Sequence, residues 1–551
     1  QASRRVQAGE VRPSELTEAC IAQMERSSWL NSFVTRCVDS ARTEAEAADA
    51  RQAKGKLLGP LDGIAYAAKD NFCTLGVPTT ASSAALAGFT PPYDSTPTRR
   101  LRQAGSPLLG KTNMDEFGMG SGNLFSCHGR TLNPWSPGPS SATSSEDAAV
   151  FVPGGSSGGS AAAVSSGACF AALGSDTGGS VRMPAAFCGV VGMKPTYGLV
   201  PRHGLIAYAS SLDTPGILAR SVLDSAMVLD VIAGPDAKDS TCLPYGCAGD
   251  FASGLLRNSR DCALGGWLEG VTVGIPKEFN VEELDAGARG AWEHTARTAA
   301  ALGATIIEVS IPSVPQALAA YAVLASAEAS SNLSRYDGLR YGERVEDTSK
   351  GAERGETEGA EAGMFRDQGD LHEEITRTRT ACFGDEVKRR ILTGCFVLCE
   401  SAYHDYYELA KKIQQRLRLE MRSALSVADV LVAPTTPFPP FMSGPPADPV
   451  ALLLNDVLTV PVSLAGLPAI SIPVSTVPAW TERRDGVARD PSSKGGADGV
   501  GEGHGDCFLP LGIQIFGRPL GDAAVLKVAH ALEHRLDFAS QIPERVKAGR
   551  C

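Results

Sequence analysis

Short apolar runs alternate with longer amphipathic stretches along most of the chain. The apolar runs are too short for helices and predict strands, one of them ending at Lys69 and the others at 170–173, 271–276, 305–312, 429–434, 469–474 and 512–517. The amphipathic stretches predict helices that begin at Pro13, cover Ser40–Lys54 and cover Ser221–Ala233. This alternation indicates an α/β fold in which helices cover both faces of a sheet.

Three segments interrupt the pattern, at 137–150, 344–370 and 481–506. The first is rich in Ser and Pro, the second in charged residues, and the third in Gly, Asp and Arg. Such compositions bury too little apolar surface to offset the cost of ordering, so we expect surface insertions there. None of them separates two independent cores, and the sequence therefore predicts a single domain over residues 1–551.

Composition and charge restrict the classes of function. A hydrophobic content of 43% with 21% charged residues is typical of a globular protein with a large core, and no apolar run is long enough to cross a membrane. The net charge of −11 disfavours a broad nucleic-acid-binding face. The 14 cysteines show neither zinc spacing nor a disulfide framework, which favours a reducing compartment. The chain begins at Gln1 rather than Met, so the sequence leaves the presence of a targeting peptide undecided.

Two short motifs offer competing interpretations. Residues 105–112 match the phosphate-binding string GxxxxGK(S/T), but Pro107 lacks an amide and a helix precedes the match, so a helix–turn–strand corner is favoured. Residues 154–158 match GxSxG, the strand-to-helix elbow that carries a nucleophilic serine in α/β-hydrolases. That alternative makes Ser156 the nucleophile and requires an acid and a histidine further along, for which the candidates are His504, His530 and His534.

A third interpretation uses two Gly/Ser-rich loops together. Gly178 and Gly179 stand directly before Ser180, where side-chain-free residues let backbone N–H groups converge on a developing oxyanion. A serine hydroxyl needs a base, and a lysine can supply it once burial lowers its pKa. Lys69, at the end of an apolar strand, is the candidate base, and Ser156 could carry the proton between Lys69 and Ser180.

These residues resemble the amidase signature family. The resemblance rests on Lys69 in KDN, on GGSSGGS at 154–160 and on GSDTGGSVRMPAAFCGVVGMKPT at 174–196. It implies an amidase-signature fold with a large mixed sheet and a signature core at about 60–225. The implied roles are general base for Lys69, bridging serine on a cis peptide for Ser156, acyl nucleophile for Ser180, and oxyanion-hole amides from Thr177, Gly178 and Gly179.

Further blocks are similar to the A subunits of glutamyl-tRNA(Gln) amidotransferases. They include YGLVPRHGLIAYASSLDTPGILARSV at 197–222, EASSNLSRYDGLRYG at 328–342, FGDEVKRRILTG at 383–394 and NDVLTVPVSLAGLPAISIPV at 455–474. This similarity implies a glutaminase with no metal or cofactor of its own. It also implies B and C subunits as partners, with ATP and Mg used by the B subunit, which holds most of the Glu-tRNA(Gln). The implied glutamine-anchoring residues are Arg389, with Arg390 as the alternative, Asp456 and Tyr321.

The sequence departs from relatives in two places. Leu124 and Phe125 stand in a block where a polar run is usual, and Met183 stands where a polar residue is usual. A stand-alone amidase acting on another small amide and a non-catalytic assembly subunit remain alternatives. The DTPGILAR form and the insertion after NPW resemble the mitochondrial version, which implies the mitochondrial matrix, with a plastid or a bacterial cytoplasm as alternatives.

Overall fold

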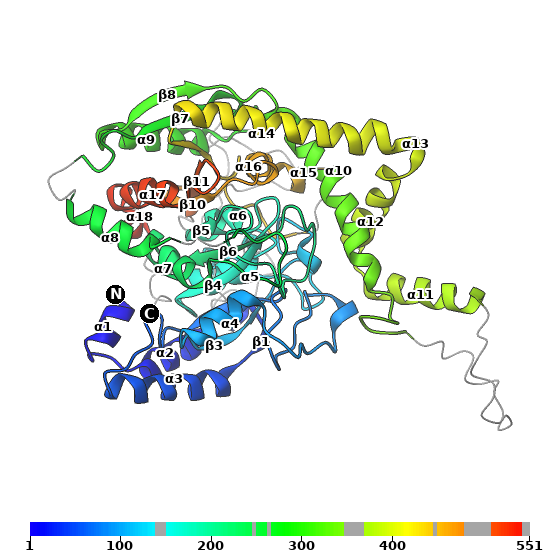
Figure 1. The fold of residues 1–551 in the computed structure, drawn as a ribbon, viewed down its shortest axis with the longest axis horizontal. Helices are drawn as coiled ribbons and strands as arrows, with labels where there is room; N and C mark the ends of the chain where they lie inside the picture. Colours follow the sequence, from blue (N-terminus) through cyan, green and yellow to red (C-terminus); the bar gives the residue numbers. More distant parts are fainter. Residues whose placement is uncertain are drawn as a thin grey trace, which may run out of the picture.

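One mixed sheet of eleven strands organises the protein (Figure 1). The computed structural model describes residues 1–137, 150–244, 249–261, 266–345, 368–444, 449–478 and 508–542. The strands are β1 Phe33–Arg36, β2 Tyr66–Lys69, β3 Leu108–Thr112, β4 Ala171–Asp176, β5 Val191–Lys194, β6 Thr214–Ala219, β7 Thr272–Pro276, β8 Thr305–Val309, β9 Val430–Pro434, β10 Ala469–Pro478 and β11 Phe508–Gly517. Their order is β1-β3-β2-β4-β6-β5-β10-β11-β9-β7-β8.

Parallel pairing occurs in two separate parts of this sheet. Strand β2 runs parallel to both β3 and β4, and β7 runs parallel to both β8 and β9. The central strands from β4 to β9 pair antiparallel. The prediction of a large mixed sheet in an α/β fold is therefore confirmed.

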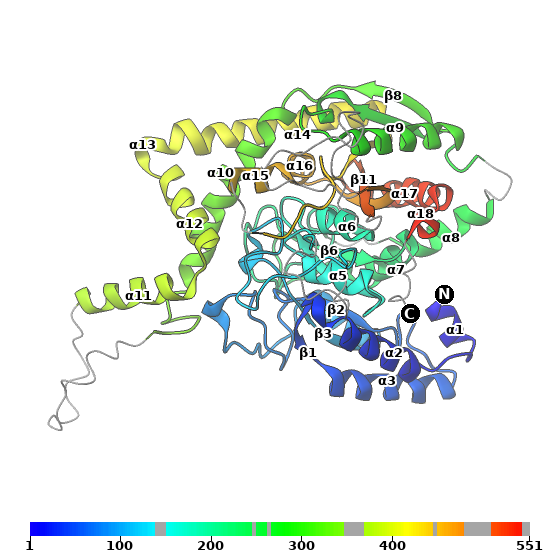
Figure 2. The same ribbon diagram turned by 180° about the vertical axis from the view of Figure 1, so that it is seen from behind.

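Helices surround the sheet. They are α1 Ala2–Gln7, α2 Pro13–Arg26, α3 Val38–Ala53, α4 Thr96–Gln103, α5 Gly158–Ser165, α6 Arg182–Cys188, α7 Val222–Ile232, α8 Phe251–Asp261, α9 Ala286–Ala301, α10 Val314–Asn332, α11 Gln368–Cys382, α12 Asp385–Val397, α13 Glu400–Tyr403, α14 Leu409–Val427, α15 Pro449–Leu454, α16 Val460–Ala465, α17 Asp522–Leu536 and α18 Phe538–Gln541. An arm that projects to one side in Figures 1 and 2 is formed by helices from the stretch α10 to α14.

Two glycines of β11 show that both faces of the sheet are covered. A Cβ atom at Gly512 would lie 2.5 Å from Ala186 on α6, and one at Gly517 would lie 2.8 Å from Val525 on α17. Because side chains alternate along a strand, positions 512 and 517 face opposite sides. Helices α6 and α17 therefore pack on opposite faces, as the alternating pattern predicted.

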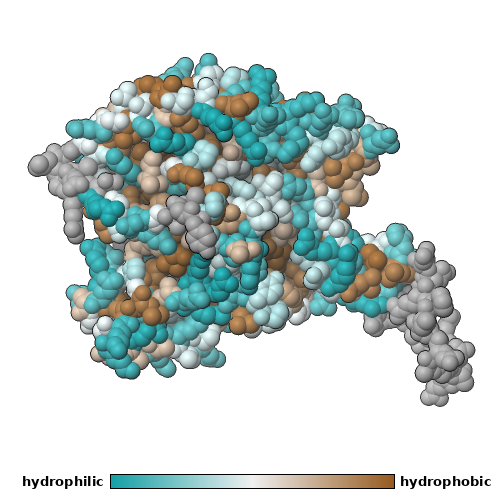
Figure 3. Space-filling view, viewed as in Figure 1, coloured by the Kyte–Doolittle hydropathy of each residue, from teal (hydrophilic) through white to brown (hydrophobic). Residues whose placement is uncertain are grey.

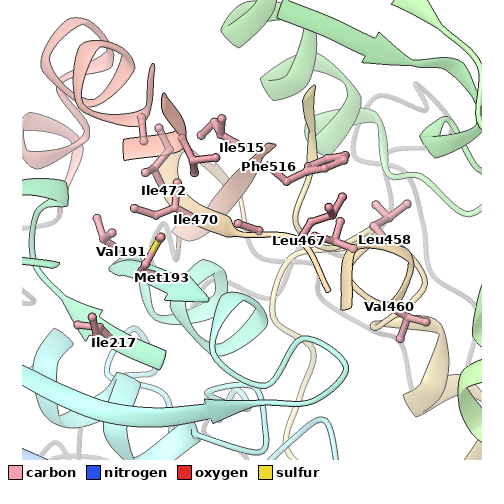
Figure 4. Packing of buried hydrophobic residues seen from close by; sticks show 14 of the residues in the cluster. Val191, Met193, Ile217, Leu458, Val460, Leu467, Ile470, Ile472, Ile515 and Phe516 are labelled. Carbon is pink, nitrogen blue, oxygen red and sulfur yellow. The ribbon is translucent and has the colours of Figure 1, made fainter. Parts of the chain in front are cut away.

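The central strands supply the main core beside the site. Ile470 and Ile472 of β10 and Ile515 and Phe516 of β11 are fully buried, together with Met193 of β5 (Figure 4). Strand β4 is longer than the predicted 170–173, because residues 174–176 continue its ladder with β6. This extension places Ser175 and Asp176 at the end of a buried strand.

The phosphate-binding interpretation of residues 105–112 is wrong. Helix α4 leads through a turn into β3, which pairs with β1 and β2, so the segment is the helix–turn–strand corner. The amino group of Lys111 is buried and donates to Phe72 O at 2.6 Å and Thr79 Oγ1 at 2.8 Å. This amino group therefore has its hydrogen-bond partners in the protein interior and does not face an open loop.

The predicted insertions fall largely outside the described residues. Residues 138–149, 346–367 and 479–507 are not among them, so the character of these segments stays a prediction. Among the helices that the structure describes, none combines the length and the apolar character needed to cross a membrane.

Candidate active site

A buried lysine lies at the centre of the candidate site. Lys69 is the last residue of β2 and has no exposed surface. Its Nζ lies 2.8 Å from Ser156 Oγ, 2.9 Å from Ser175 Oγ and 3.4 Å from Ser175 O. Asn71 Nδ2 also donates to Ser175 Oγ, at 3.0 Å. The structure therefore brings together the predicted base and the predicted bridging serine.

The loop that carries Ser156 leads into α5. The peptide bond between Gly155 and Ser156 is cis, as the resemblance implied. The next residue joins this loop to the second one, because Ser157 N donates to Ser180 O at 3.2 Å. Ser156 and Ser180 are thus carried on two loops in contact.

Ser180 lies in the turn between β4 and α6 and is buried. Among the hydrogen bonds of the described residues, none joins the Ser180 and Ser156 side chains. Among these same hydrogen bonds, none is donated by the backbone N–H groups of Gly178, Gly179 or Ser180. Free amides in a buried turn suit an oxyanion, but the catalytic role of this turn stays a prediction.

The two glycines before Ser180 are required by close packing. A Cβ atom at Gly178 would lie 2.7 Å from the Tyr321 hydroxyl, and one at Gly179 would lie 2.2 Å from Thr459 Oγ1. Gly179 also has φ +154. Neither position has room for a side chain.

A buried ion pair fixes the end of this turn. Arg182 Nη2 donates to Asp176 Oδ1 at 3.0 Å, and Arg182 Nε donates to the other oxygen of Asp176 at 3.0 Å. The remaining guanidinium nitrogen donates to Thr459 O and to Gln514 Oε1, both at 3.0 Å. Such a bidentate pair holds both strand end and helix start in one geometry.

The predicted anchoring residues Tyr321 and Asp456 lie beside the turn. The Tyr321 hydroxyl meets Gly178, and Asp456 Oδ1 would lie 3.2 Å from a Cβ at Gly179. Asp456 accepts a hydrogen bond from Ser121 at 2.6 Å, and burial raises its pKa to about 7. Both side chains are placed to contact a substrate that reaches Ser180.

Of the two candidate arginines, Arg390 reaches Tyr321 and Asp456, and Arg389 does not. The Arg389 side chain is 50% exposed and pairs with Glu386, whereas that of Arg390 is only 13% exposed. Arg390 Nη1 donates to the Tyr208 hydroxyl at 2.6 Å, and its charge interacts with Tyr321 and Asp456. The position predicted for Arg389 is therefore corrected to Arg390, the alternative that the sequence left open.

Burial sets the proton affinity of the central groups. Loss of solvent lowers the pKa of Lys69 to about 7, against the raising effect of the Asp115, Asp176 and Asp213 carboxylates. Burial also raises the pKa of Asp115 to about 6, although this carboxylate accepts three backbone hydrogen bonds, from Asn123, Leu124 and Phe125. A large fraction of Lys69 is neutral near pH 7, as a general base requires.

Several residues of the site were missed from the sequence. They are Asp115, Ser121, Ser175, Tyr208 and Asp213. Ser175 stood inside the quoted GSDTGGS motif and at the end of the β4 extension, which was the available signal. Tyr208 and Asp213 lie in the quoted block at 197–222, on the loop before β6, and Asp115 and Ser121 lie on the loop after β3.

The two departures from relatives form one apolar cluster. Met183 packs with Val152 and Phe187, and Leu124 and Phe441 pack against them. The backbone N–H groups of Leu124 and Phe125 still donate to Asp115, at 2.9 and 3.1 Å. The altered block therefore contributes an apolar wall by its side chains and a polar contact by its amides.

The elbow interpretation of Ser156 is wrong. Among the described residues directly before the loop, 150–153, Phe151 forms an isolated bridge rather than a strand, and Ser156 contacts Lys69. His530 and His534 lie on α17, where their rings contact Trp267, and His504 lies outside the described residues. Over the ranges that the structure describes, no three His, Cys, Asp or Glu side chains are grouped as a metal site would need.

The chain is similar to known amidases along nearly its whole length. The family model described as "Amidase" matches residues 15–526. The A subunit of glutamyl-tRNA(Gln) amidotransferase from Synechococcus sp. (strain CC9605) is 42% identical, over 98% of this chain and 96% of its own. The protein of the same name from Chloroflexus aurantiacus (strain ATCC 29366 / DSM 635 / J-10-fl) is 40% identical, over 98% and 96% of the two chains.

Solved structures give the same result. The crystal structure of the A subunit of glutamyl-tRNA(Gln) amidotransferase from Thermotoga maritima matches with a TM-score of 0.66 and 32% identity, over 95% of this chain and 91% of that one. The native peptide amidase of Stenotrophomonas maltophilia matches with a TM-score of 0.71 and 27% identity, over 97% and 96%.

The lowered pKa of Lys69 predicts the pH dependence of Ser180 reactivity. Only the neutral amine accepts a proton, so the rate of labelling by a fluorophosphonate should rise as pH increases through about 7 and level off above about 8. Mass spectrometry of the labelled protein measures this rate. A rate that stays flat from about pH 6 to about pH 8 would remove Lys69 from the role of base.

Close packing at Gly178 predicts that Gly178→Ala impairs the turn. The added methyl group would meet the Tyr321 ring, displace the free amides and slow the same labelling by about tenfold or more. Gly290→Ala on α9 is the matched control, because a Cβ there meets no atom within 4 Å. Equal labelling rates for the two variants would contradict the steric requirement.

Proposed function

Because the chain belongs to the amidase family, we propose that it hydrolyses glutamine as the A subunit of a glutamyl-tRNA(Gln) amidotransferase. One observation carries the choice of glutamine. The Asp456 carboxylate lies against the buried turn of Ser180, and the Arg390 guanidinium interacts electrostatically with it. A free α-amino acid presents the two charges that complement this pair.

Glutamine would be oriented by these two residues. Arg390 would bind the α-carboxylate, and Asp456 would bind the α-ammonium group, whose charge favours the ionised form of this buried carboxylate. Tyr321, between them and Gly178, would line the path of the side chain. The side-chain amide then reaches Ser180.

The buried lysine would start the acylation step. Ser175 presents two acceptors to Nζ, its hydroxyl and its carbonyl oxygen, so a neutral Lys69 can direct both N–H bonds there and its lone pair toward Ser156. Lys69 takes the proton of Ser156, which takes the proton of Ser180 as Ser180 Oγ attacks the amide carbon. The amides of the turn stabilise the oxyanion.

The intermediate then collapses to a glutamyl ester on Ser180. The proton held by Lys69 returns through Ser156 to the leaving nitrogen, and ammonia departs. A water molecule, deprotonated by the same route, attacks the ester and releases glutamate. Lys69 returns each proton within the same half of the reaction, to the leaving nitrogen in the first half and to Ser180 Oγ in the second.

The ammonia would serve a partner protein. In our proposal a B subunit uses ATP and Mg to activate Glu-tRNA(Gln) and holds most of the tRNA, a C subunit completes a heterotrimer, and this chain carries no cofactor. An exposed apolar surface supports a role within such an assembly. It lies on the projecting arm (Figure 3) and is formed by Leu392, Phe396, Leu398, Tyr406 and Leu409.

A stand-alone amidase is the second candidate, since the peptide amidase of Stenotrophomonas maltophilia shares the fold. The pair formed by Arg390 and Asp456 favours an amino-acid substrate over a neutral amide. The relatives named above are bacterial, and the mitochondrial matrix stays a prediction from the sequence, with a plastid or a bacterial cytoplasm as the alternatives.

Release of ammonia from glutamine tests the function. The purified chain should release ammonia from glutamine, and the B and C partners, ATP and Glu-tRNA(Gln) should direct that ammonia to tRNA. Ser180→Ala and Lys69→Ala should each lower the rate by about a thousandfold or more, because the nucleophile or its base is lost. Hydrolysis of neutral amides without hydrolysis of glutamine would favour the stand-alone amidase instead.

Neighbouring arginines offer a matched test of the anchoring assignment. Arg390→Ala should raise the KM for glutamine by about 10- to 100-fold, because a charge-assisted bond to the α-carboxylate is lost. Arg389→Ala should leave KM within about twofold, because that side chain lies half exposed and pairs with Glu386. The reverse result would restore Arg389 as the anchor.

A further inference from the structure

Tyr208 lies at a junction between the two halves of the candidate site. Its hydroxyl accepts a hydrogen bond from Arg390 at 2.6 Å and interacts with that of Tyr321. Its backbone N–H donates to Asp213 at 2.9 Å. One residue thus contacts the α-carboxylate end of the site by its side chain and a buried carboxylate by its backbone.

Asp213 continues this connection to the turn before Ser180. It is buried and accepts from Thr177 Oγ1 at 2.7 Å, besides the backbone N–H groups of Tyr208 and Ala209. The partners are two backbone N–H groups, which only donate, and the Thr177 hydroxyl. The carboxylate accepts from all three.

A second connection reaches the same turn through Tyr321. The Tyr321 hydroxyl, which interacts with Tyr208, lies where a Cβ at Gly178 would approach within 2.7 Å. Two routes therefore lead from Tyr208 to adjacent residues of the turn, one through Asp213 to Thr177 and one through Tyr321 to Gly178. Both are buried and closely packed.

We propose that Tyr208 and Asp213 are positioning residues that join Arg390 to the turn of Thr177–Ser180. The inference rests on the proposed function, in which Arg390 binds the α-carboxylate. The link keeps the carboxylate-binding guanidinium and the oxyanion-binding amides at a fixed separation. A loosened carboxylate end then also impairs the oxyanion end.

The decisive experiment changes a residue at the carboxylate-binding end of the site and measures the reactivity of Ser180 at the other end. Tyr208→Phe keeps the ring and removes the hydroxyl that contacts Arg390 and Tyr321. We expect it to lower kcat/KM for glutamine by about 10- to 100-fold and to slow fluorophosphonate labelling of Ser180 by about three- to tenfold. The fluorophosphonate has no α-carboxylate, so its rate reports on the nucleophile and the oxyanion amides alone.

Asp213→Asn tests the other route, because it removes the charge and one of the two accepting oxygens. It should slow labelling by a similar factor and also raise the KM for glutamine. Ser211→Ala is the control in the same loop: its hydroxyl bonds Glu328 at the surface and lies outside both routes. It should change neither rate by more than about twofold, and thermal melting should show that all three variants fold.

The outcomes separate the two hypotheses. If Tyr208→Phe raises the KM for glutamine but leaves labelling unchanged, the ends are independent and the link is refuted. If the unaltered chain does not hydrolyse glutamine yet Tyr208→Phe and Asp213→Asn slow labelling, the proposed function fails and the link stands. Unchanged labelling in both variants refutes the link whatever the substrate.

Discussion

The whole site depends on a lysine amino group buried with hydroxyl and carbonyl partners. Lys69 lies against Ser156 and Ser175, and among the salt bridges of the described residues none includes it. Lys111, one strand away and equally buried, lies 3.6 Å from the Asp70 carboxylate. An unpaired amine in the interior favours its neutral form, which is the form that can take a proton.

That constraint explains why polar and small residues crowd around the lysine. The Asp115 carboxylate lies so close to the Ser156 loop that a Cβ at Gly155 would be 2.1 Å away. The carboxylate is held by three backbone amides and stays beside Lys69 as a charge without forming an ion pair. Glycine provides the space for this arrangement, and the buried hydrogen bonds fix it.

Motif spacing in the sequence indicated Lys69, Ser156 and Ser180 but not the residues that surround them. Short apolar runs predicted most strands with displaced ends, whereas β1, β5 and β6 were missed. Adjacent helical residues point about 100° apart, so choosing between Arg389 and Arg390 required the inner face of α12. Val387 and Gly394 are buried on that face and lie three and four residues from Arg390, a periodicity that was available. The contacts of Tyr208 and Asp213 depend on how loops meet in three dimensions, which no local pattern shows.

Where the sequence departs from relatives, at Leu124 and Met183, side chains and backbone have separate roles. Their side chains meet in one apolar cluster, so each substitution supplies the apolar neighbour that the other needs. A single polar-to-apolar change there would leave a polar group facing an apolar one, at a cost of about 1–3 kcal/mol. The amides of 123–125 keep their bonds to Asp115 regardless of the side chains they carry. The wall can therefore change its polarity while the electrostatic surroundings of Lys69 are preserved.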